Sequence, residues 1–363
     1  MTGLAWQDAR KILCVRLDHL GDVLMTTPAI RALKQSHPGR HVTLLASRSG
    51  AAAVPHIPEI DAVITWDAPW MKLAQSTSAC ADLAMRSTLE ARRFDAAVIF
   101  TVYSQSPLPA ALFCHLAGIP LRLAHCRENP YHLLTDWVRE TEPESGVRHE
   151  VRRQLDLVAA VGARTDDERL SFRVSAEERL RAGMKLAEAG IDPERPWIAV
   201  HPGATAPSRR YDPERLARAA FELSRILRCQ VAITGDASER ELAERVRFHA
   251  GPAARSLAGQ LSLADFAGVI AQAPLLISNN TGAVHVAAAL GTPVVDLYAL
   301  TNTQHTPWLV PHRVLSRDVP CRNCYKSVCP HGTNACLDIP VDAVVAAACE
   351  VWNRVDRRFR RAA

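Results

Sequence analysis

Polar residues mark a turn between a predicted strand and a predicted helix in the stretch 278–295, "SNNTGAVHVAAALGTPVV"; this turn is called the corner below. An apolar run, "APLLI", ends there, and Thr281 and Gly282 then open a segment rich in Ala and Val. A helix that begins at such a corner presents free backbone N–H groups and the positive end of its dipole, which together suit an anion. Asn280 stands at the start of this helix, and His285 lies one turn further on. The corner therefore predicts an anion site.

Two further strand ends carry groups that could bind a phosphorylated ligand. "HPGATAPSRR" follows the apolar run "WIAV". Its small residues would let backbone N–H groups approach a phosphate, on which Arg209 could close with two hydrogen bonds. "TGDASERELAERV" follows another apolar run, and Glu239 could accept hydrogen bonds from ribose hydroxyls. An ordinary first-turn glutamate is the alternative for Glu239, and a structural histidine is the alternative for His285. Taken together, these features favour a nucleotide diphosphate.

A carboxylate stands in the loop after the first apolar run, in "KILCVRLDHLGDVLMTTPAIRAL". Asp22 falls at the start of a predicted helix, whose dipole would keep the carboxylate ionised. An ionised carboxylate can take a proton from an attacking hydroxyl, so Asp22 is a candidate general base; a helix cap is the alternative. Asp18 and His19 in the same loop are secondary candidates, which could cap or orient. The loop lacks the G-x-G-x-x-G fingerprint of dinucleotide-binding proteins.

Four cysteines stand close together in "CRNCYKSVCPHGTNAC", spaced C-x2-C-x4-C-x6-C. They are Cys321, Cys324, Cys329 and Cys336. The C-x2-C spacing is typical of thiolate metal ligation, so a structural metal ion is one interpretation. Disulfides or free thiols are the other. Four thiolates would leave no open coordination position, so such a metal would stabilise the loop and would not catalyse. The scattered cysteines are predicted to be small core residues: Cys14, Cys80, Cys114 and Cys229.

Short apolar runs alternate with amphipathic segments of helical length along the whole sequence. The runs predict buried parallel strands at 11–17, 41–47, 62–66, 96–100, 121–126, 197–203, 230–236, 275–280 and 293–298. A chain of 363 residues with 48% hydrophobic content is long enough for two domains. We expect two Rossmann-like doubly wound α/β units with a cleft between them. Their boundaries are predicted at 1–180 and 181–340, with a terminal helix at 341–363 that packs back across the junction.

Composition limits the location and the partners. The net charge of +5 is modest, and no nucleic-acid partner is expected. The N-terminal "MTGLAWQDARKILCVRL" is interrupted by charges and lacks the apolar core of a signal peptide, and no segment is predicted to span a membrane. A cytoplasmic location with reduced thiols is therefore expected. The arginine-rich "NRVDRRFRRAA" is interpreted either as a solvated helix end or as a docking segment for anionic lipid or a phosphorylated acceptor.

The ordered motifs together resemble glycosyltransferase family 9, the bacterial ADP-heptose heptosyltransferases of lipopolysaccharide core assembly. The resemblance covers nearly the whole chain. It rests on "VRLDHLGDVLMTTPAIRALKQSHP", "VHPGATAPSRRYDPERLARAA", "LAGQLSLADFAGVIAQAPLLISNNTGAVHVAAALGTPVV" and the cysteine-bearing tail. It implies a GT-B architecture, with the acceptor in the N-terminal domain and the nucleotide sugar in the C-terminal one. It also implies inverting, metal-independent transfer for which no cofactor is required.

The resemblance also implies roles for individual residues. Asp22 matches the proposed catalytic base of the family. Arg209 falls near a basic residue that contacts the donor phosphates, and Glu239 falls near an acid that contacts the ribose. A related group of protein heptosyltransferases uses cysteines to hold iron, so the four clustered cysteines could hold structural iron or zinc.

The donor motif of the family, "D-T-G-x-x-H", matches Thr281, Gly282 and His285. This chain departs from the motif at Asn280, which replaces the usual aspartate. An amide keeps its hydrogen-bonding capacity but gains a donor and loses a charge. The substitution therefore changes one contact with the sugar or ribose hydroxyls, and it makes the corner less repulsive to a diphosphate.

The function implied by the resemblance is transfer of a heptose from ADP-heptose to an acceptor hydroxyl. A glycolipid, the lipopolysaccharide inner core, is the expected acceptor, and the enzyme would work at the inner membrane surface. A protein or a natural-product scaffold is the alternative acceptor. A GT-B sugar-nucleotide epimerase is a second class of function, and a non-catalytic carbohydrate-binding protein is a third. The third class is disfavoured because Asp22, Arg209 and the Thr281 corner are retained together.

Overall fold

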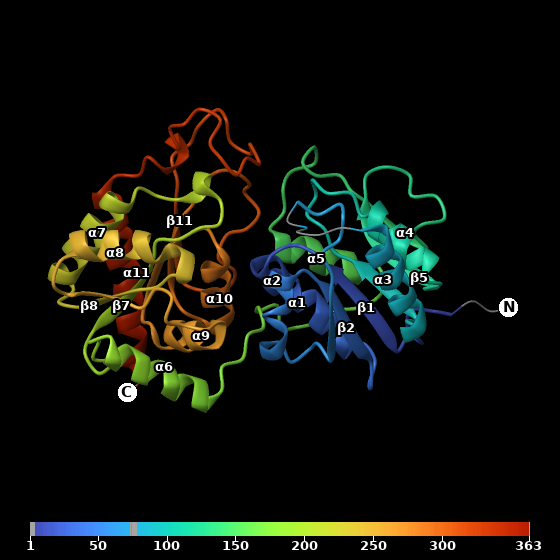
Figure 1. Cartoon of the computed structure of the whole chain (residues 1–363), viewed down its shortest axis with the longest axis horizontal. Helices are drawn as coiled ribbons and strands as arrows, with labels where there is room; N and C mark the ends of the chain where they lie inside the picture. Colours follow the sequence, from blue (N-terminus) through green and yellow to red (C-terminus); the bar gives the residue numbers. More distant parts are fainter. Residues whose placement is uncertain (1–3, 73, 75–77, 363) are drawn as a thin grey trace. The chain divides into compact units, whose positions relative to one another are not determined.

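The computed structural model describes residues 4–72, 74 and 78–362, with side chains as far as Arg354. The chain forms two compact α/β units that divide between Phe172 and Arg173 (Figure 1). The boundary predicted after residue 180 falls inside helix α6 (Ala176–Glu188), which packs against α9 (Leu263–Gln272) of the second unit. The second unit therefore begins earlier than expected.

The first unit is built on a parallel sheet with the strand order β3-β2-β1-β4-β5-β6. Its strands are β1 (Lys11–Arg16), β2 (His41–Ala46), β3 (Ala62–Thr65), β4 (Ala96–Ile99), β5 (Leu121–Cys126) and β6 (Asp136–Arg139). Helices α1 (Leu20–Gln35), α2 (Arg48–Ala51) and α5 (Glu150–Ala159) pack together, and short η1 (Val54–His56) follows α2. Helices α3 (Ala79–Arg92) and α4 (Leu108–Leu116) cover the opposite face, where they bury Leu13, Val15 and Ile99.

The second unit repeats this topology in the order β12-β11-β10-β7-β8-β9. Its strands are β7 (Trp197–His201), β8 (Gln230–Ile233), β9 (Ala254–Ser256), β10 (Leu276–Asn279), β11 (Val294–Leu297) and β12 (His312–Leu315). Helices α7 (Pro213–Ile226), α8 (Arg240–Ala250) and α11 (Val341–Ala362) cover one face, and α6, α9 and α10 (Gly282–Leu290) cover the other. Three short helices lie in loops: η2 (Pro207–Arg209), η3 (Ala237–Glu239) and η4 (Ala335–Leu337).

The prediction of two doubly wound α/β units is confirmed. All nine predicted strands are present. Eight of them are largely buried and read as apolar runs, and the edge strand β3, which is mostly exposed, was found from its apolar and β-branched residues alone. Sequence analysis missed β6, β9 and β12. Each of these lies at the edge of its sheet and is only partly buried, so no apolar run marks it.

The terminal helix α11 packs against α7, β11 and β12 of the second unit, and its contact with the first unit stays a prediction. Arg354 pairs with Glu350 on the same helix, with 2.7 Å between Nη2 and Oε1. The arginine side chains that follow, which were interpreted as a lipid contact, lie outside the described residues. Within the described part of the chain, no helix combines the length and apolar character that a membrane span needs.

Three of the scattered cysteines, Cys14, Cys114 and Cys229, are buried as predicted. The prediction was wrong for Cys80, which is exposed. This residue lies in the first turn of α3, a helix on which Leu89 is the one fully buried residue among those described. The small Ala and Ser residues around Cys80 do not form an apolar run of the kind that marks a buried strand, so the sequence does not indicate whether Cys80 is buried.

Candidate functional site

In each sheet the strand order reverses between two central neighbours, β1 and β4 in the first unit and β7 and β10 in the second. Ligands of open α/β sheets bind at the carboxyl ends of the strands at such a reversal. All the predicted donor residues follow the carboxyl ends of β7, β8 and β10, and Asp22 follows β1. The topology therefore brings each predicted set to one edge of its own sheet.

Asp22 is the third residue of α1, which begins at Leu20 with His19 as its N-cap. The backbone N–H of His19 donates to Asp22 Oδ2 at 3.1 Å, so the carboxylate closes a capping box. Its other oxygen, Oδ1, accepts a hydrogen bond from Arg16 Nη2 at 3.2 Å. The side chain is 14% exposed. The capping alternative is thus part of the geometry, and a role as base stays a prediction.

Arg16, which sequence analysis missed, is fully buried at the end of β1 and pairs with three carboxylates. These belong to Asp18, Asp22 and Glu150. Burial raises the pKa of Asp18, and the neighbouring Asp22 and Glu150 raise it further, against the lowering effect of Arg16 and of a hydrogen bond from Gln105. No local pattern marked Glu150, because it lies 134 residues from its partner in the chain.

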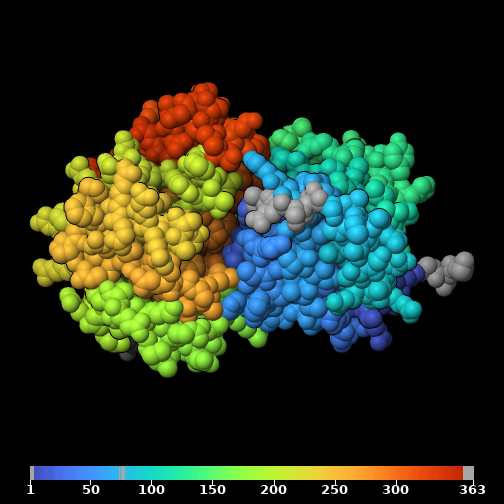
Figure 2. Space-filling model, viewed as in Figure 1, coloured from blue at the N-terminus to red at the C-terminus, as the bar shows by residue number. Residues whose placement is uncertain are grey.

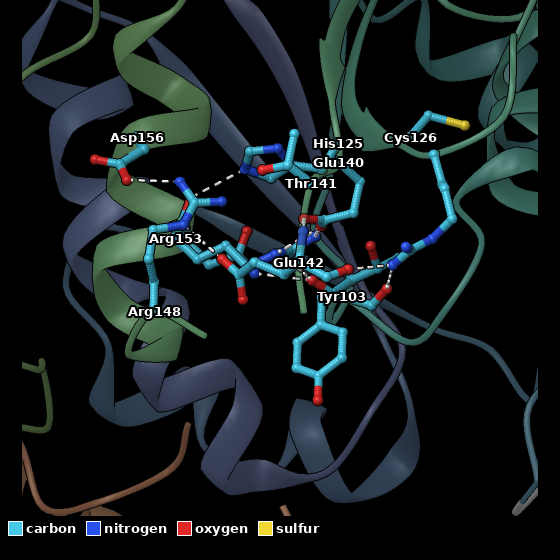
Figure 3. Close-up of polar contacts among 12 residues, drawn as sticks. Tyr103, His125, Cys126, Glu140, Thr141, Glu142, Arg148, Arg153 and Asp156 are labelled. Atoms are coloured by element: carbon cyan, nitrogen blue, oxygen red, sulfur yellow. Dashed lines mark hydrogen bonds and ion pairs between the residues drawn. The ribbon is translucent and has the colours of Figure 1, made fainter. Parts of the chain in front are cut away.

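A second buried polar group lies beside it, at the ends of β4, β5 and β6 (Figure 3). Arg153 of α5 donates through Nε to Glu140 Oε2 at 3.0 Å and also bonds the carbonyl oxygen of Thr101. His125 Nε2 lies 3.1 Å from the carbonyl oxygen of Arg153. Burial, followed by the positive charge of Arg153, lowers the pKa of His125 to about 4, so this imidazole is neutral near pH 7. The group ties three strand ends to α5.

In the second unit, Asn279 holds the loop after β7 in place. Its Nδ2 donates to the carbonyl oxygen of Pro202 at 2.7 Å, and its Oδ1 accepts from the backbone N–H of Tyr211 at 2.9 Å. Asn279 is completely buried. Tyr211 in turn donates its hydroxyl to the carbonyl oxygen of Ile339 at 2.8 Å. The first asparagine of the "NN" pair is therefore structural.

Glu239 lies at the end of η3, directly over Gly203. A Cβ atom at Gly203 would stand 1.9 Å from Glu239 Oε1, so a larger residue there would displace the Glu239 carboxylate. Glu239 Oε2 accepts from the backbone N–H of Asp236 at 3.0 Å, which is the ordinary role of a first-turn glutamate. His201, a further residue that sequence analysis missed, has its Nε2 3.9 Å from the same oxygen. The feature of the sequence that could have identified His201 is its position at the end of the predicted strand "WIAVH". Burial lowers the pKa of His201 despite the opposing effect of Glu239 and Asp236.

Arg209 stands at the end of η2 and is partly exposed. Its guanidinium makes no hydrogen bond or ion pair with the residues that the structure describes. Its neighbour Ser208 is buried and is anchored to the cysteine-rich segment, defined here as residues 321–336. The Ser208 hydroxyl donates to the carbonyl oxygen of Lys326 at 2.7 Å, and its N–H donates to that of Ser327 at 3.1 Å. This segment therefore holds the backbone next to Arg209 in place and leaves the guanidinium available for a ligand.

Thr281 is the N-cap of α10, and its Oγ1 accepts from the N–H of Ala283 at 3.2 Å. His285 is buried on the same helix, with its ring edge toward His305 at 6.4 Å between centroids. Asn280 is also buried, and its side chain hydrogen-bonds the hydroxyl of Tyr298. The predicted contacts of these residues with a donor stay predictions. Their contacts inside the protein hold the turn between β10 and α10 in place.

The four clustered cysteines line one cavity of about 330 Å³, together with Ser208 and Thr301. Figure 2 shows the cysteine-rich segment within the red lobe at the top of the second unit. Cys321 and Cys324 lie close enough to Cys336 to raise its pKa, after the larger effect of burial. Burial raises the pKa of Cys329, but the backbone N–H groups at 331–334 together outweigh it and lower this pKa. Within the described residues, however, no three His, Cys, Asp or Glu side chains converge as a metal-ligand set.

Comparison with known proteins gives the family. Residues 83–334 match the model of glycosyltransferase family 9 (heptosyltransferase). The chain belongs to this family. It is therefore a glycosyltransferase, and its curated relatives include lipooligosaccharide and lipopolysaccharide heptosyltransferases.

Two relatives show how far the likeness of this family 9 chain extends. Lipopolysaccharide heptosyltransferase 2 of Escherichia coli is 26% identical over 307 residues, which cover 82% of this chain and 85% of the relative. Lipopolysaccharide heptosyltransferase 1 of Pseudomonas aeruginosa is 27% identical over 331 residues, which cover 88% of each chain.

Solved structures confirm the GT-B fold class. ADP-heptose lipopolysaccharide heptosyltransferase II of E. coli superposes with a TM-score of 0.72 at 23% identity and covers 95% of this chain and 99% of its own. An E. coli heptosyltransferase solved with ADP-2-deoxy-2-fluoro heptose gives a TM-score of 0.66 at 19% identity, with coverage of 94% and 99%. At these identities the likeness concerns the fold.

Proposed function

We propose that this family 9 enzyme transfers a heptose from ADP-heptose to a hydroxyl of the lipopolysaccharide inner core, with inversion and without a catalytic metal. The observation that carries the proposal is the carboxyl edge of the second sheet, where the available cation of Arg209, the N-terminus of α10 and Glu239 stand at successive strand ends. A diphosphate needs a cation and free N–H groups, and a ribose needs an acceptor for its hydroxyls.

In the proposed reaction the acceptor hydroxyl attacks the anomeric carbon from the face opposite the nucleotide. Asp22 takes the hydroxyl proton as the new glycosidic bond forms, and the bond to the diphosphate breaks. Arg209 and the backbone at Thr281 and Gly282 stabilise the charge that develops on the departing ADP. Because the N-terminus of α10 and the backbone that carries Arg209 are in place before the donor arrives, only the Arg209 side chain has to close on the diphosphate.

Glu239 and its neighbour His201 are the proposed partners of the ribose. Both lie at the ends of adjacent strands, and a neutral imidazole can donate or accept as the hydroxyls require. The acceptor is assigned to the first unit because Asp22 is there. The proposed work site is the cytoplasmic face of the inner membrane, which the enzyme would contact peripherally. A protein or small-molecule acceptor is the alternative.

The test of the donor site is thermal stability with ADP, UDP, GDP and ADP-heptose. A ligand at 100 times its Kd adds about 2.7 kcal/mol to the stability of the unit that binds it. We expect stabilisation by ADP and ADP-heptose alone. Arg209→Gln should weaken ADP binding about 10–100-fold, since a hydrogen bond to a charged group contributes about 1.5–3 kcal/mol.

Arg210→Gln is the matched control. Its guanidinium is occupied by the carbonyl oxygen of Ala204 at 2.8 Å, so its loss should leave the Kd for ADP unchanged. Selective stabilisation by UDP or GDP would overturn the proposed donor. Conversion of ADP-heptose to an isomer in the absence of any acceptor would instead identify an epimerase.

We further propose that the cysteine-rich segment holds a structural iron or zinc ion through Cys321, Cys324, Cys329 and Cys336. Support comes from their soft sulfur donors and from the single cavity that they share. When bound, the metal would crosslink the segment and take no part in transfer. Purified protein should contain about one equivalent of metal, and Cys324→Ser should lower this content while Cys80→Ser should not. A content well below one equivalent in the unaltered protein would contradict the proposal.

A further inference from the structure

Arg16 lies at the centre of the polar group around Asp22. Its side chain has no exposed surface. Nε lies 3.1 Å from Asp18 Oδ2, Nη2 lies 3.2 Å from Asp22 Oδ1, and Nη1 lies 2.9 Å from Glu150 Oε1. One guanidinium thus contacts three carboxylates, which come from the loop after β1, from α1 and from α5.

Glu150 fixes the orientation of this guanidinium. It lies in the first turn of α5 and is completely buried. Its Oε1 also accepts a hydrogen bond from Gln154 Nε2 at 2.6 Å, and the same amide donates to the carbonyl oxygen of Thr101 at 3.0 Å. Glu150 is therefore held from the side of α5 and from the end of β4, and Arg16 cannot swing toward solvent without leaving a buried carboxylate behind.

Asp18 closes the group from the other side. Its Oδ1 accepts from Gln105 Nε2 at 2.7 Å, while its Oδ2 faces Arg16. Three carboxylates around one guanidinium leave an excess of negative charge wherever all are ionised. Burial strengthens each of these interactions, so every member of the group affects the ionisation of the others.

We propose that Arg16 and Glu150 are positioning residues for the base: Glu150 orients the Arg16 guanidinium, and Arg16 holds Asp22 in place and keeps it ionised. This inference rests on the proposed role of Asp22 in the transfer reaction.

The pH dependence of kcat is the decisive measurement. Arg16→Gln removes the cation beside Asp22, so the acidic limb should move up by about 1–3 pH units. Glu150→Gln removes a negative charge and leaves Arg16 to Asp18 and Asp22, so the limb should move down. The KM for the donor should change in neither variant. Opposite shifts cannot arise from general damage to the fold.

Other charged groups lie near this end of α1. Arg153 and Glu140 of the neighbouring group pair with each other and change in neither variant. His19 caps α1 and His149 caps α5, and neither changes in the two variants. Arg48 of α2 is occupied by Asp67, with 3.1 Å between Nε and Oδ2. The matched control is Glu59→Gln. Glu59 pairs with Arg31, which lies on α1 nine residues after Asp22, with 2.8 Å between Oε1 and Nε. Both side chains are 11% exposed. The pH profile of Glu59→Gln should match that of the unaltered enzyme.

Carboxyl-carbon NMR titration of the full chain supplies a readout that needs no substrate. The Asp22 resonance should titrate higher in Arg16→Gln and lower in Glu150→Gln. If Arg16→Gln does not fold, Glu150→Gln alone decides the question. Shifts in the same direction, or no shift in Glu150→Gln, would overturn the inference. An active Asp22→Asn enzyme would instead overturn the proposed function, whatever the titrations show.

Discussion

Asp22→Asn is expected to lower kcat by about 10²–10⁴-fold and to leave the Kd for ADP nearly unchanged. The amide has the shape of the carboxylate but cannot take a proton at neutral pH. Its one carbonyl oxygen can accept from the His19 N–H or from Arg16, whereas the carboxylate accepts from both. Steady-state kinetics with ADP-heptose, paired with calorimetric titration of ADP, measures both quantities.

Asp82→Asn provides the matched control for this result. Asp82 also lies in the first turn of a helix, α3, so its replacement removes a similar interaction with a helix dipole. It should leave kcat unchanged. If Asp22→Asn lost ADP binding and not turnover, the residue would belong to the donor site and the assignment as base would be wrong.

The second large effect is expected on stability, from Arg153→Met. Arg153 is 1% exposed, and its loss leaves the buried Oε2 of Glu140 without its donor (Figure 3). The carbonyl oxygen of Thr101 loses one of its two donors and keeps Gln154 Nε2. Removal of one partner of a buried ion pair costs about 3–5 kcal/mol. For a unit of this size the cost corresponds to a fall in Tm of about 6–20 °C, which scanning calorimetry would measure.

Arg152→Met separates this effect from a general effect on α5. Arg152 is the preceding residue, its side chain is 43% exposed, and it pairs with Glu168, so the change should cost no more than about 1 kcal/mol. Adding Glu140→Leu to Arg153→Met should recover much of the loss, because the uncompensated charge is then gone. Equal falls in Tm for Arg152→Met and Arg153→Met would contradict the interpretation.

The loss in Arg153→Met should also depend on pH. Burial raises the pKa of Glu140, but Arg153 and the backbone N–H of Glu142 outweigh it, so the pKa lies below its usual range. A carboxyl group with a lowered pKa stabilises the fold above its unfolded pKa, and this contribution disappears as the pH falls through the folded value. The difference in the free energy of unfolding between the unaltered enzyme and Arg153→Met should therefore be smaller in mild acid than at pH 7.

The interior of both sheets could be predicted from the sequence because a strand buried on both faces leaves an apolar run. The helix that starts at Pro213 was likewise predictable, because its cap, Asp212, accepts from the N–H of Arg215 only three residues away. The edge strands β6, β9 and β12 carry no comparable signal, although the edge strand β3 could still be recognised. Apolar runs and helix caps involve residues close together in the chain, so they predict the individual elements, and the order of the elements predicts the fold class.

The polar surroundings of the site were harder to predict, because their partners are distant in the chain. Asp22 was found by its place after a strand, but Glu150 lies in a helix whose charges look like those of any solvated face. The "NN" pair shows the same limit at close range. Nothing in the letters distinguishes Asn279, which bonds the loop after β7, from Asn280, which bonds Tyr298.

The bonds of Asn279 have a consequence for how the second unit moves. A loop that binds phosphates in an α/β protein commonly opens by itself, because its backbone is bonded mainly to water. Here the loop after β7 is tied through Asn279 to the central strand β10, and through Tyr211 to the chain before α11. The amide hydrogen of Tyr211 should therefore exchange with solvent at the slow rate of the sheet, and the two ends of the loop should open only together with β10.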